Sequence, residues 1–366
     1  MLRAINTVPC TPALNACRQL QVQLFEWLCD PVVGPQDLTQ ANLRVRFNTQ
    51  IEADWLWGLL QKADKSVTLL THAQTLAGSP RAKAPLRAWV HAVSNVPAQF
   101  EANPPVWPAG LPNLVLTAAE KTAVGSLALC FYTKGLKATQ GLPYASNGVP
   151  TTMAGVTYSR FVQEFRDAHR ASLVRHAREV CVLCGGPLGS PEVDHWILES
   201  AFPILSVCGL NLLPACGECN SPAYKGQKPV FAENTPSAFA DWFHPYCRPA
   251  NGAFQLSYVA HNAEVVVSAV NVIDVNKVNN LNELLCLESR WTREFKAQYE
   301  TVWGQVKKLV RVHRLTATSA AIAGYIQTQQ AALLQTEPHF HVHQLVLTAV
   351  LEPARLAAWE AELRMP

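Results

Sequence analysis

The sequence predicts an α+β fold in which a small central module, held by a four-cysteine zinc site, stands between a helical N-terminal region and a C-terminal region of one β-hairpin and several helices. Three observations predict it: helical spacing of apolar residues near the start, two Cys-x-x-Cys pairs in the middle, and a Val-rich stretch with a central turn followed by renewed helical spacing. We expect a helical domain over 1–140, a linker over 141–156, the module over 157–235 with a leading basic helix, and a mixed, mainly helical region over 236–366.

The first 140 residues are expected to be helical because their apolar residues recur every three or four positions. The residues that show this spacing are Leu14, Cys17, Leu24, Leu28, Ile51, Trp55 and Leu59. Thr117 followed by Glu120 is a capping-box signature, so a helix should begin there. The stretch GLPYASNGVPTTMAG, residues 141–155, is rich in Gly and Pro and predicts a domain boundary.

A basic helix is expected over residues 157–180. Phe161 and Phe165 belong to an incomplete apolar stripe, and arginines fill much of the remaining surface. Three of these arginines, Arg170, Arg175 and Arg178, are candidate phosphate contacts on a helix that leads into the cysteine module. The alternative is a solvated helix face beside the core.

The C-terminal region should open with a hairpin. Residues 253–272 are rich in Val, with Phe and Tyr beside it, and His261 and Asn262 are placed at the turn. Helical spacing then resumes from Leu284 through Leu309, and residues 353–364 are a candidate for a further helix.

Composition excludes several classes of protein. The chain has 366 residues, 49% hydrophobic and 16% charged, with a net charge of +3, so it predicts a globular protein without a strongly basic tail. No run of about 18 apolar residues occurs and the first residues lack the apolar stretch of a signal peptide. We therefore expect a cytoplasmic protein that does not enter the membrane. In such a reducing compartment we expect its eleven cysteines to be metal ligands or buried apolar groups and not to form disulfides.

Two cysteine pairs predict a zinc site. Cys181-x-x-Cys184 and Cys216-x-x-Cys219 each let a tight turn aim two sulfurs at one ion, and both turns carry glycine. Four cysteines close the coordination sphere of Zn²⁺, so the ion is structural and any chemistry must lie in the chain that the two turns enclose.

The enclosed chain carries a recognisable order of residues. Asp194-His195, Asn211 in LNLLPAC, Asn220 directly after Cys219, and Lys225-Gly226 follow one another within the cysteine frame. In this order they resemble the HNH endonuclease motif in its zinc-stapled form, with Asn as the third letter. The resemblance covers residues 181–228.

The resemblance implies a DNA endonuclease built on two antiparallel strands and a helix. His195 would be the general base, Asp194 and Asn220 the ligands of a catalytic Mg²⁺ or Mn²⁺, and Asn211 the residue that steadies the loop behind His195. EVDHWIL would lie on the first strand and Asn220 would open the helix. A histidine can take a proton from water near neutral pH, and a hard divalent cation can polarise a phosphate.

Nucleic-acid contacts would come mainly from outside the motif. Residues 179–230 hold five acids and two lysines, so DNA would be repelled unless a cation lies among them. Lys225 and Lys228 are candidate phosphate contacts, and equally well solvated surface residues.

Two further hypotheses stay open. The first alternative is a non-catalytic zinc-stapled module that binds nucleic acid or protein. A second is that the flanking regions bind a partner protein that gates the nuclease. DWFHPYCRP, residues 241–249, resembles segments that follow the motif in some bacterial HNH proteins, including some that look like antiphage-defence effectors.

Overall fold

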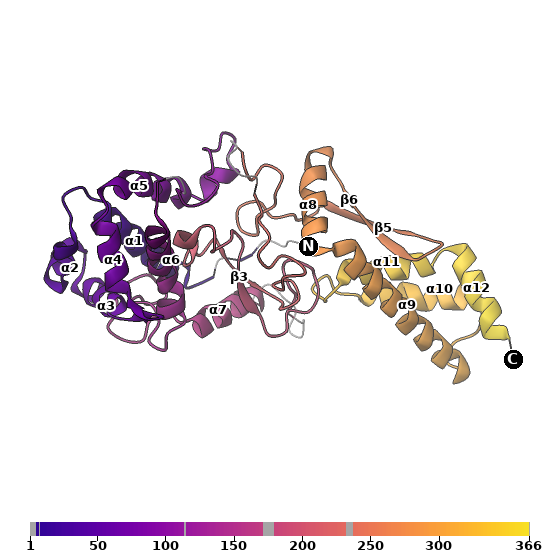
Figure 1. Cartoon of the computed structure of the whole chain (residues 1–366). Helices are drawn as coiled ribbons and strands as arrows, with labels where there is room; N and C mark the ends of the chain where they lie inside the picture. Colours follow the sequence, from indigo (N-terminus) through magenta and orange to yellow (C-terminus); the bar gives the residue numbers. More distant parts are fainter. Residues whose placement is uncertain (1–4, 7, 113–114, 171–178, 232–236, 366) are drawn as a thin grey trace.

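The computed structural model describes residues 5–6, 8–112, 115–170, 179–231 and 237–365, and the side chain of Arg170 is not described. The helices of the N-terminal region gather at one end of the molecule, α7 (Tyr158–Arg170) and β3 (Glu192–His195) lie in the middle, and the elements from β5 (Phe254–Val259) to α12 (Pro353–Arg364) form the other end (Figure 1). In the part of the chain that is described, no helix combines the length and apolarity needed to cross a membrane.

The N-terminal region is helical, as predicted. Its helices are α1 (Thr11–Leu28), η1 (Pro35–Asp37), α2 (Gln40–Arg46), α3 (Gln50–Leu60), α4 (Leu69–Ala77), α5 (Pro80–Ser94), η2 (Pro97–Phe100) and α6 (Ala118–Cys130), with the short strands β1 (Ala63–Asp64) and β2 (Val67–Thr68) between α3 and α4. Threonine caps recur because their side-chain oxygen satisfies a free amide of the first turn: Thr49 caps α3 and Thr68 caps α4.

Helix α6 begins at a capping box and ends in a π-helical turn. The capping box of Thr117 and Glu120 is confirmed, with both reciprocal hydrogen bonds present. At its other end α6 runs directly into a π-helical turn, η3 (Phe131–Leu136). Such turns shift the direction of the side chains that follow, and here Tyr132 lies in the turn.

The central module contains one two-stranded antiparallel sheet. Strand β3 (Glu192–His195) pairs with β4 (Leu212–Ala215), and His195 lies opposite Leu212. The loop between them includes the short helix η4 (Pro203–Leu205). Of the basic helix predicted over 157–180, the described part is α7 (Tyr158–Arg170), which buries Phe161 and Phe165.

One expected element of the module is replaced by turns. No helix begins at Asn220: within the described residues 216–231 the chain forms successive turns and bends. The amides of Asn220 and Lys225 donate to the carbonyls of Cys216 and Cys219, respectively. The backbone at this point therefore closes tight turns around the cysteines, and the two-strand-and-helix arrangement implied by the resemblance is not formed in the described residues.

The C-terminal region has the predicted hairpin and helices. Strand β5 (Phe254–Val259) pairs with β6 (Glu264–Ala269), and β6 packs on α9. The remaining elements are η5 (Val272–Asp274), α8 (Val275–Leu285), α9 (Leu287–Arg311), α10 (Ser319–Ala332), α11 (Phe340–Val350) and α12 (Pro353–Arg364). Cys286 has a left-handed backbone (φ 49°), so the helical spacing across it belongs to two helices and not one.

Buried apolar residues from all regions form one contiguous core. The stretch expected to be a linker is itself packed: the amide of Leu142 donates to the Val156 carbonyl, and the buried hydroxyl of Tyr144 donates to Glu52. The domain boundaries at 140, 157 and 235 stay predictions.

Candidate metal centre and histidine site

The two cysteine turns have the same local geometry. The amide four residues after the first cysteine donates to that cysteine's carbonyl in both: Gly185 to Cys181, and Asn220 to Cys216. Gly185 has a φ of 75°, a left-handed conformation that glycine adopts without the strain a Cβ would bring. This glycine explains how the first pair can turn tightly enough to aim both sulfurs one way.

The four sulfurs converge, as the spacing predicts. The Sγ atoms of Cys181, Cys184, Cys216 and Cys219 all lie within 4.8 Å of one another, and no other such group of three or more His, Cys, Asp or Glu is found in the described residues. The distances are 4.0 Å from Cys181 to Cys219 and 3.9 Å from Cys184 to Cys216. Four sulfurs about 2.3 Å from a zinc ion at the centre of a tetrahedron would be about 3.8 Å apart.

The surroundings of the sulfurs also fit a metal-bound thiolate cluster. The amide of Gly186 donates to Cys184 Sγ and the amide of Cys216 donates to Cys181 Sγ. Hydrogen bonds from Cys181 lower the pKa of the Cys184 and Cys216 thiols, while the pKa of Cys181 and Cys219 is raised within the same cluster. Bound Zn²⁺ would hold all four as thiolates, because a cysteine loses its proton when it binds a metal.

His195 ends strand β3 with both ring nitrogens engaged. Nε2 lies 3.0 Å from the Ser206 carbonyl oxygen, and Nδ1 lies 2.9 Å from Glu199 Oε2. Carbonyl and carboxylate oxygens only accept, so Nε2 donates to Ser206, and Nδ1 donates to Glu199 when the imidazole is protonated. The His195 side chain is 8% exposed and that of Glu199 is 34% exposed.

Three residues around this histidine were not predicted. The Tyr132 ring meets His195 edge-on at 4.8 Å, and the Lys137 ammonium lies over the Tyr132 ring at 4.6 Å. Burial alone would raise the pKa of the Glu199 carboxyl, but the contact with His195, assisted by Lys137, lowers it. Glu199 lies four residues after His195, so its nearness could have been suggested from the sequence. Tyr132 and Lys137 are brought close only by the fold.

Asp194 faces away from His195, as adjacent residues of a strand do. Its carboxylate forms an ion pair with Lys225, whose Nζ lies 3.0 Å from Oδ2 and also donates to the His195 carbonyl. Burial raises the pKa of Asp194 and lowers the pKa of Lys225, and their mutual attraction opposes both changes. Lys225 is completely buried, so in this structure it is neither a solvated surface residue nor accessible to a phosphate.

Asn211 fastens the loop that follows β3. Its side chain is fully buried, its Oδ1 accepts from the amide of Ile197, and its Nδ2 donates to the carbonyls of Ile197 and Leu205. The loop carrying Glu199 and Ser206 is therefore held against the hairpin.

The residues expected to bind a catalytic cation are each paired with another side chain. Asn220 Nδ2 donates to Glu192 Oε2 at 2.7 Å, while Asp194 is occupied by Lys225. These pairings leave Mg²⁺ or Mn²⁺ without a preformed set of oxygen ligands from Asp194 and Asn220, because an ammonium group already neutralises the carboxylate.

The predicted phosphate contacts are only partly visible. Arg175 and Arg178 lie outside the described residues, and Arg170 is the last residue of α7. Two other arginines of α7, Arg160 and Arg166, pair with Glu164 and Glu179. Lys228 is half-buried and its Nζ donates to the Ala223 carbonyl.

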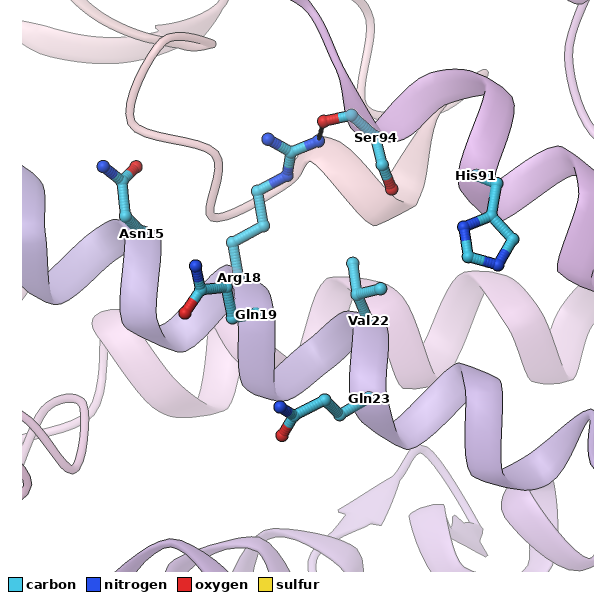
Figure 2. A pocket seen from close by; sticks show the side chains of 7 residues that line it. All are labelled: Asn15, Arg18, Gln19, Val22, Gln23, His91 and Ser94. Carbon is cyan, nitrogen blue, oxygen red and sulfur yellow. Dashed lines mark hydrogen bonds between the residues drawn. The ribbon is translucent and has the colours of Figure 1, made fainter. Parts of the chain in front are cut away.

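The larger hollows lie elsewhere in the N-terminal region. Figure 2 shows a pocket of about 420 Å³ where Arg18 of α1 reaches the Ser94 carbonyl at the end of α5, beside the amides of Asn15, Gln19 and Gln23. A second hollow of about 760 Å³ runs between α3 and residues 139–154. Neither is lined by the residues predicted for the site.

Comparisons with protein-family models, with curated proteins and with solved structures find no match for this chain. The converging cysteines are thus the part of the predicted site that the geometry supports, as a group able to hold a metal such as zinc.

Proposed function

We propose that this chain is an HNH-type endonuclease that hydrolyses phosphodiester bonds of DNA, with a structural zinc in the four-cysteine centre. The observation that carries the proposal is the setting of His195. One ring nitrogen is fixed by the Ser206 carbonyl and the other faces the Glu199 carboxylate. A histidine held at one ring nitrogen by a backbone carbonyl, with a movable carboxylate at the other, can act as a general base once the carboxylate moves away.

In this proposal Glu199 first turns away from His195 Nδ1, and the neutral imidazole takes a proton at Nδ1 from the water whose oxygen attacks phosphorus. The bond from phosphorus to the leaving sugar oxygen breaks, and that oxygen takes a proton from solvent. Glu199 is ionised because its pKa is lowered, so it stabilises the imidazolium that forms. Lys137 is exposed beside Tyr132 and gives the phosphate a positive contact at the same edge.

A divalent cation, Mg²⁺ or Mn²⁺, would supply charge stabilisation for the phosphate when bound. Asp194 can offer it a carboxylate only after Lys225 moves away, and the Asn220 side chain is held through its Nδ2 by Glu192. The described arrangement is then a closed form of the site.

The test is cleavage of supercoiled plasmid DNA by the full chain with Mg²⁺ or Mn²⁺. His195→Ala should lower the rate about 100- to 10,000-fold, the range for loss of a general base. His91→Ala is the matched control, because His91 is an exposed histidine of α5 paired with Glu26. Equal cutting by the natural chain and His195→Ala at equal zinc content would contradict the proposal.

A second candidate function is a non-catalytic zinc-stapled binding module, for nucleic acid or protein. It is favoured by the burial of the catalytic candidates, since Asp194 and His195 are both nearly inaccessible and already paired. Absence of cutting under all metal conditions, with DNA binding that His195→Ala leaves unchanged, would favour this module.

A further inference from the structure

The C-terminal region holds both cysteine turns of the metal centre. From α9, Arg290 donates to Cys219 Sγ at 3.3 Å and the Trp291 indole donates to the Cys184 carbonyl at 3.1 Å. The backbone amide of His339, at the start of α11, donates to the Gly185 carbonyl at 2.6 Å. Each cysteine pair is therefore contacted by residues from a part of the chain at least 70 positions further on.

Arg290 is the member of this set that carries charge. Its side chain is 7% exposed, pairs with Glu218 at 2.7 Å and lies over the Tyr224 ring at 4.6 Å. An arginine guanidinium carries its positive charge at any ordinary pH, so Arg290 faces the sulfur of Cys219 as a cation.

Zinc with four thiolates has a formal charge of −2, since two positive charges meet four negative ones. A buried excess of charge is costly unless a partner of opposite sign lies against it. The Arg290 guanidinium touches a ligand sulfur from inside the protein, and charge-assisted contacts of this kind tune metal affinity.

We propose that Arg290 is part of the metal centre as the charge partner of its thiolates, so that zinc binding and the docking of α9 and α11 stabilise each other. The coupling is reciprocal, because any free energy that docking adds to zinc binding is also added by zinc to docking. The metal then fastens the C-terminal helices to the central module as well as joining the two cysteine turns. This inference does not depend on nuclease activity.

Zinc release from the full chain, measured with an excess of chelator and a coloured zinc indicator, tests the role of Arg290. Arg290→Met should release zinc about 10- to 100-fold faster, because removing a residue that contacts a metal ligand usually weakens metal binding by about this factor. Arg293→Met is the matched control: Arg293 also contacts Glu218 but is 66% exposed, and no contact of Arg293 with a ligand sulfur is seen in the described residues. Its release rate should stay within about twofold of the natural chain.

Hydrogen–deuterium exchange tests the other half of the coupling. Removing zinc should raise exchange in α9 and α11 and leave α4 in the N-terminal region unchanged. If Arg290→Met fails to fold, Arg290→Lys is the variant to use. It keeps the positive charge but lacks the planar guanidinium group, so it should release zinc at an intermediate rate. Release from Arg290→Met or Arg290→Lys at the natural rate, a natural chain that retains no zinc, or unchanged exchange of α9 and α11 after chelation would each overturn the proposal.

Discussion

The four-cysteine centre and the β3–β4 hairpin beside it are neighbours in the chain, but their polar side chains are arranged differently. The centre gathers four like sulfur ligands onto one point. The hairpin gives each polar group a separate partner: Lys225 for Asp194, Glu192 for Asn220, and Ser206 with Glu199 for His195. Like ligands gathered together indicate a bound ion, whereas polar groups paired one by one are stable without one.

The difference has an energetic meaning. Four buried thiolates repel one another unless a cation lies between them, so a metal such as zinc, if bound, would stabilise the centre. A buried ion pair has its compensation already in place, and its stability depends on keeping both members. The two regions should therefore respond differently to loss of a single group.

The largest effect is expected at the cysteines. Cys181→Ser should abolish tight zinc binding, and the folding free energy that the metal supplies, on the order of 10 kcal/mol for structural zinc, should be lost from the module. Zinc content per chain and urea unfolding measure this. Cys286→Ser is the control, because Cys286 is half-buried and outside the cluster. Full zinc content in Cys181→Ser would show that Cys181 is not a ligand, and natural stability without zinc would show that the fold does not depend on the metal.

The next effect tests the paired arrangement of the hairpin. Lys225→Met leaves the buried Asp194 carboxylate without its cation and should cost about 3–5 kcal/mol of unfolding free energy. The double change Asp194→Leu with Lys225→Met removes both charges and should recover most of that loss. Chemical denaturation of Lys225→Met, Asp194→Leu and the double variant beside the natural chain gives the coupling between the two residues. A loss below about 1 kcal/mol in Lys225→Met would mean that the pair does not act as a buried unit.

The features that could be predicted from the sequence depend on residues close together in the chain. The cysteine pairs, the cap at Thr117 and the hairpin over 254–269 depend on residues a few positions apart, and each was predicted with its type. The burial of Lys225 depends on Asp194, about 30 residues away, and the surroundings of His195 depend on Tyr132, about 60 residues away. No local spacing records those contacts, and nuclease activity stays a prediction because it rests on residues of this second kind.

A third effect concerns a buried histidine that is paired only in part. His244 Nδ1 accepts the amides of Tyr246 and Cys247, and burial, aided by the charge of Arg248, lowers its pKa to about 3. An unfolded histidine titrates near 6.5. Below that pH His244 is protonated in the unfolded chain but not in the folded chain. The free energy of unfolding should therefore fall by up to about 1.4 kcal/mol per pH unit from about 6.5 toward 3.

Urea midpoints at pH 7, 6 and 5 measure the contribution of His244. His244→Asn keeps an acceptor for the two amides and cannot be protonated, so its midpoint should change less with pH than that of the natural chain. His91→Asn, at an exposed histidine, should leave the slope as it is. The same slope in His244→Asn and the natural chain would assign the acid sensitivity to other groups.

The smallest effect is expected where the partners are nearest in sequence. Thr117→Ala removes the side-chain oxygen that accepts the Glu120 amide and should cost about 1 kcal/mol. Burial alone would raise the pKa of Glu120, but hydrogen bonds from Ser79 and Thr117 lower it to about 2, so its contribution is complete above about 4.5 and lost as pH falls through about 2. Thr122→Ala, on the exposed face of the same helix, is the control and should change stability by less than about 0.5 kcal/mol. Thermal unfolding at pH 7 compares the two, and equal losses would mean that the cap adds nothing beyond ordinary helix propensity.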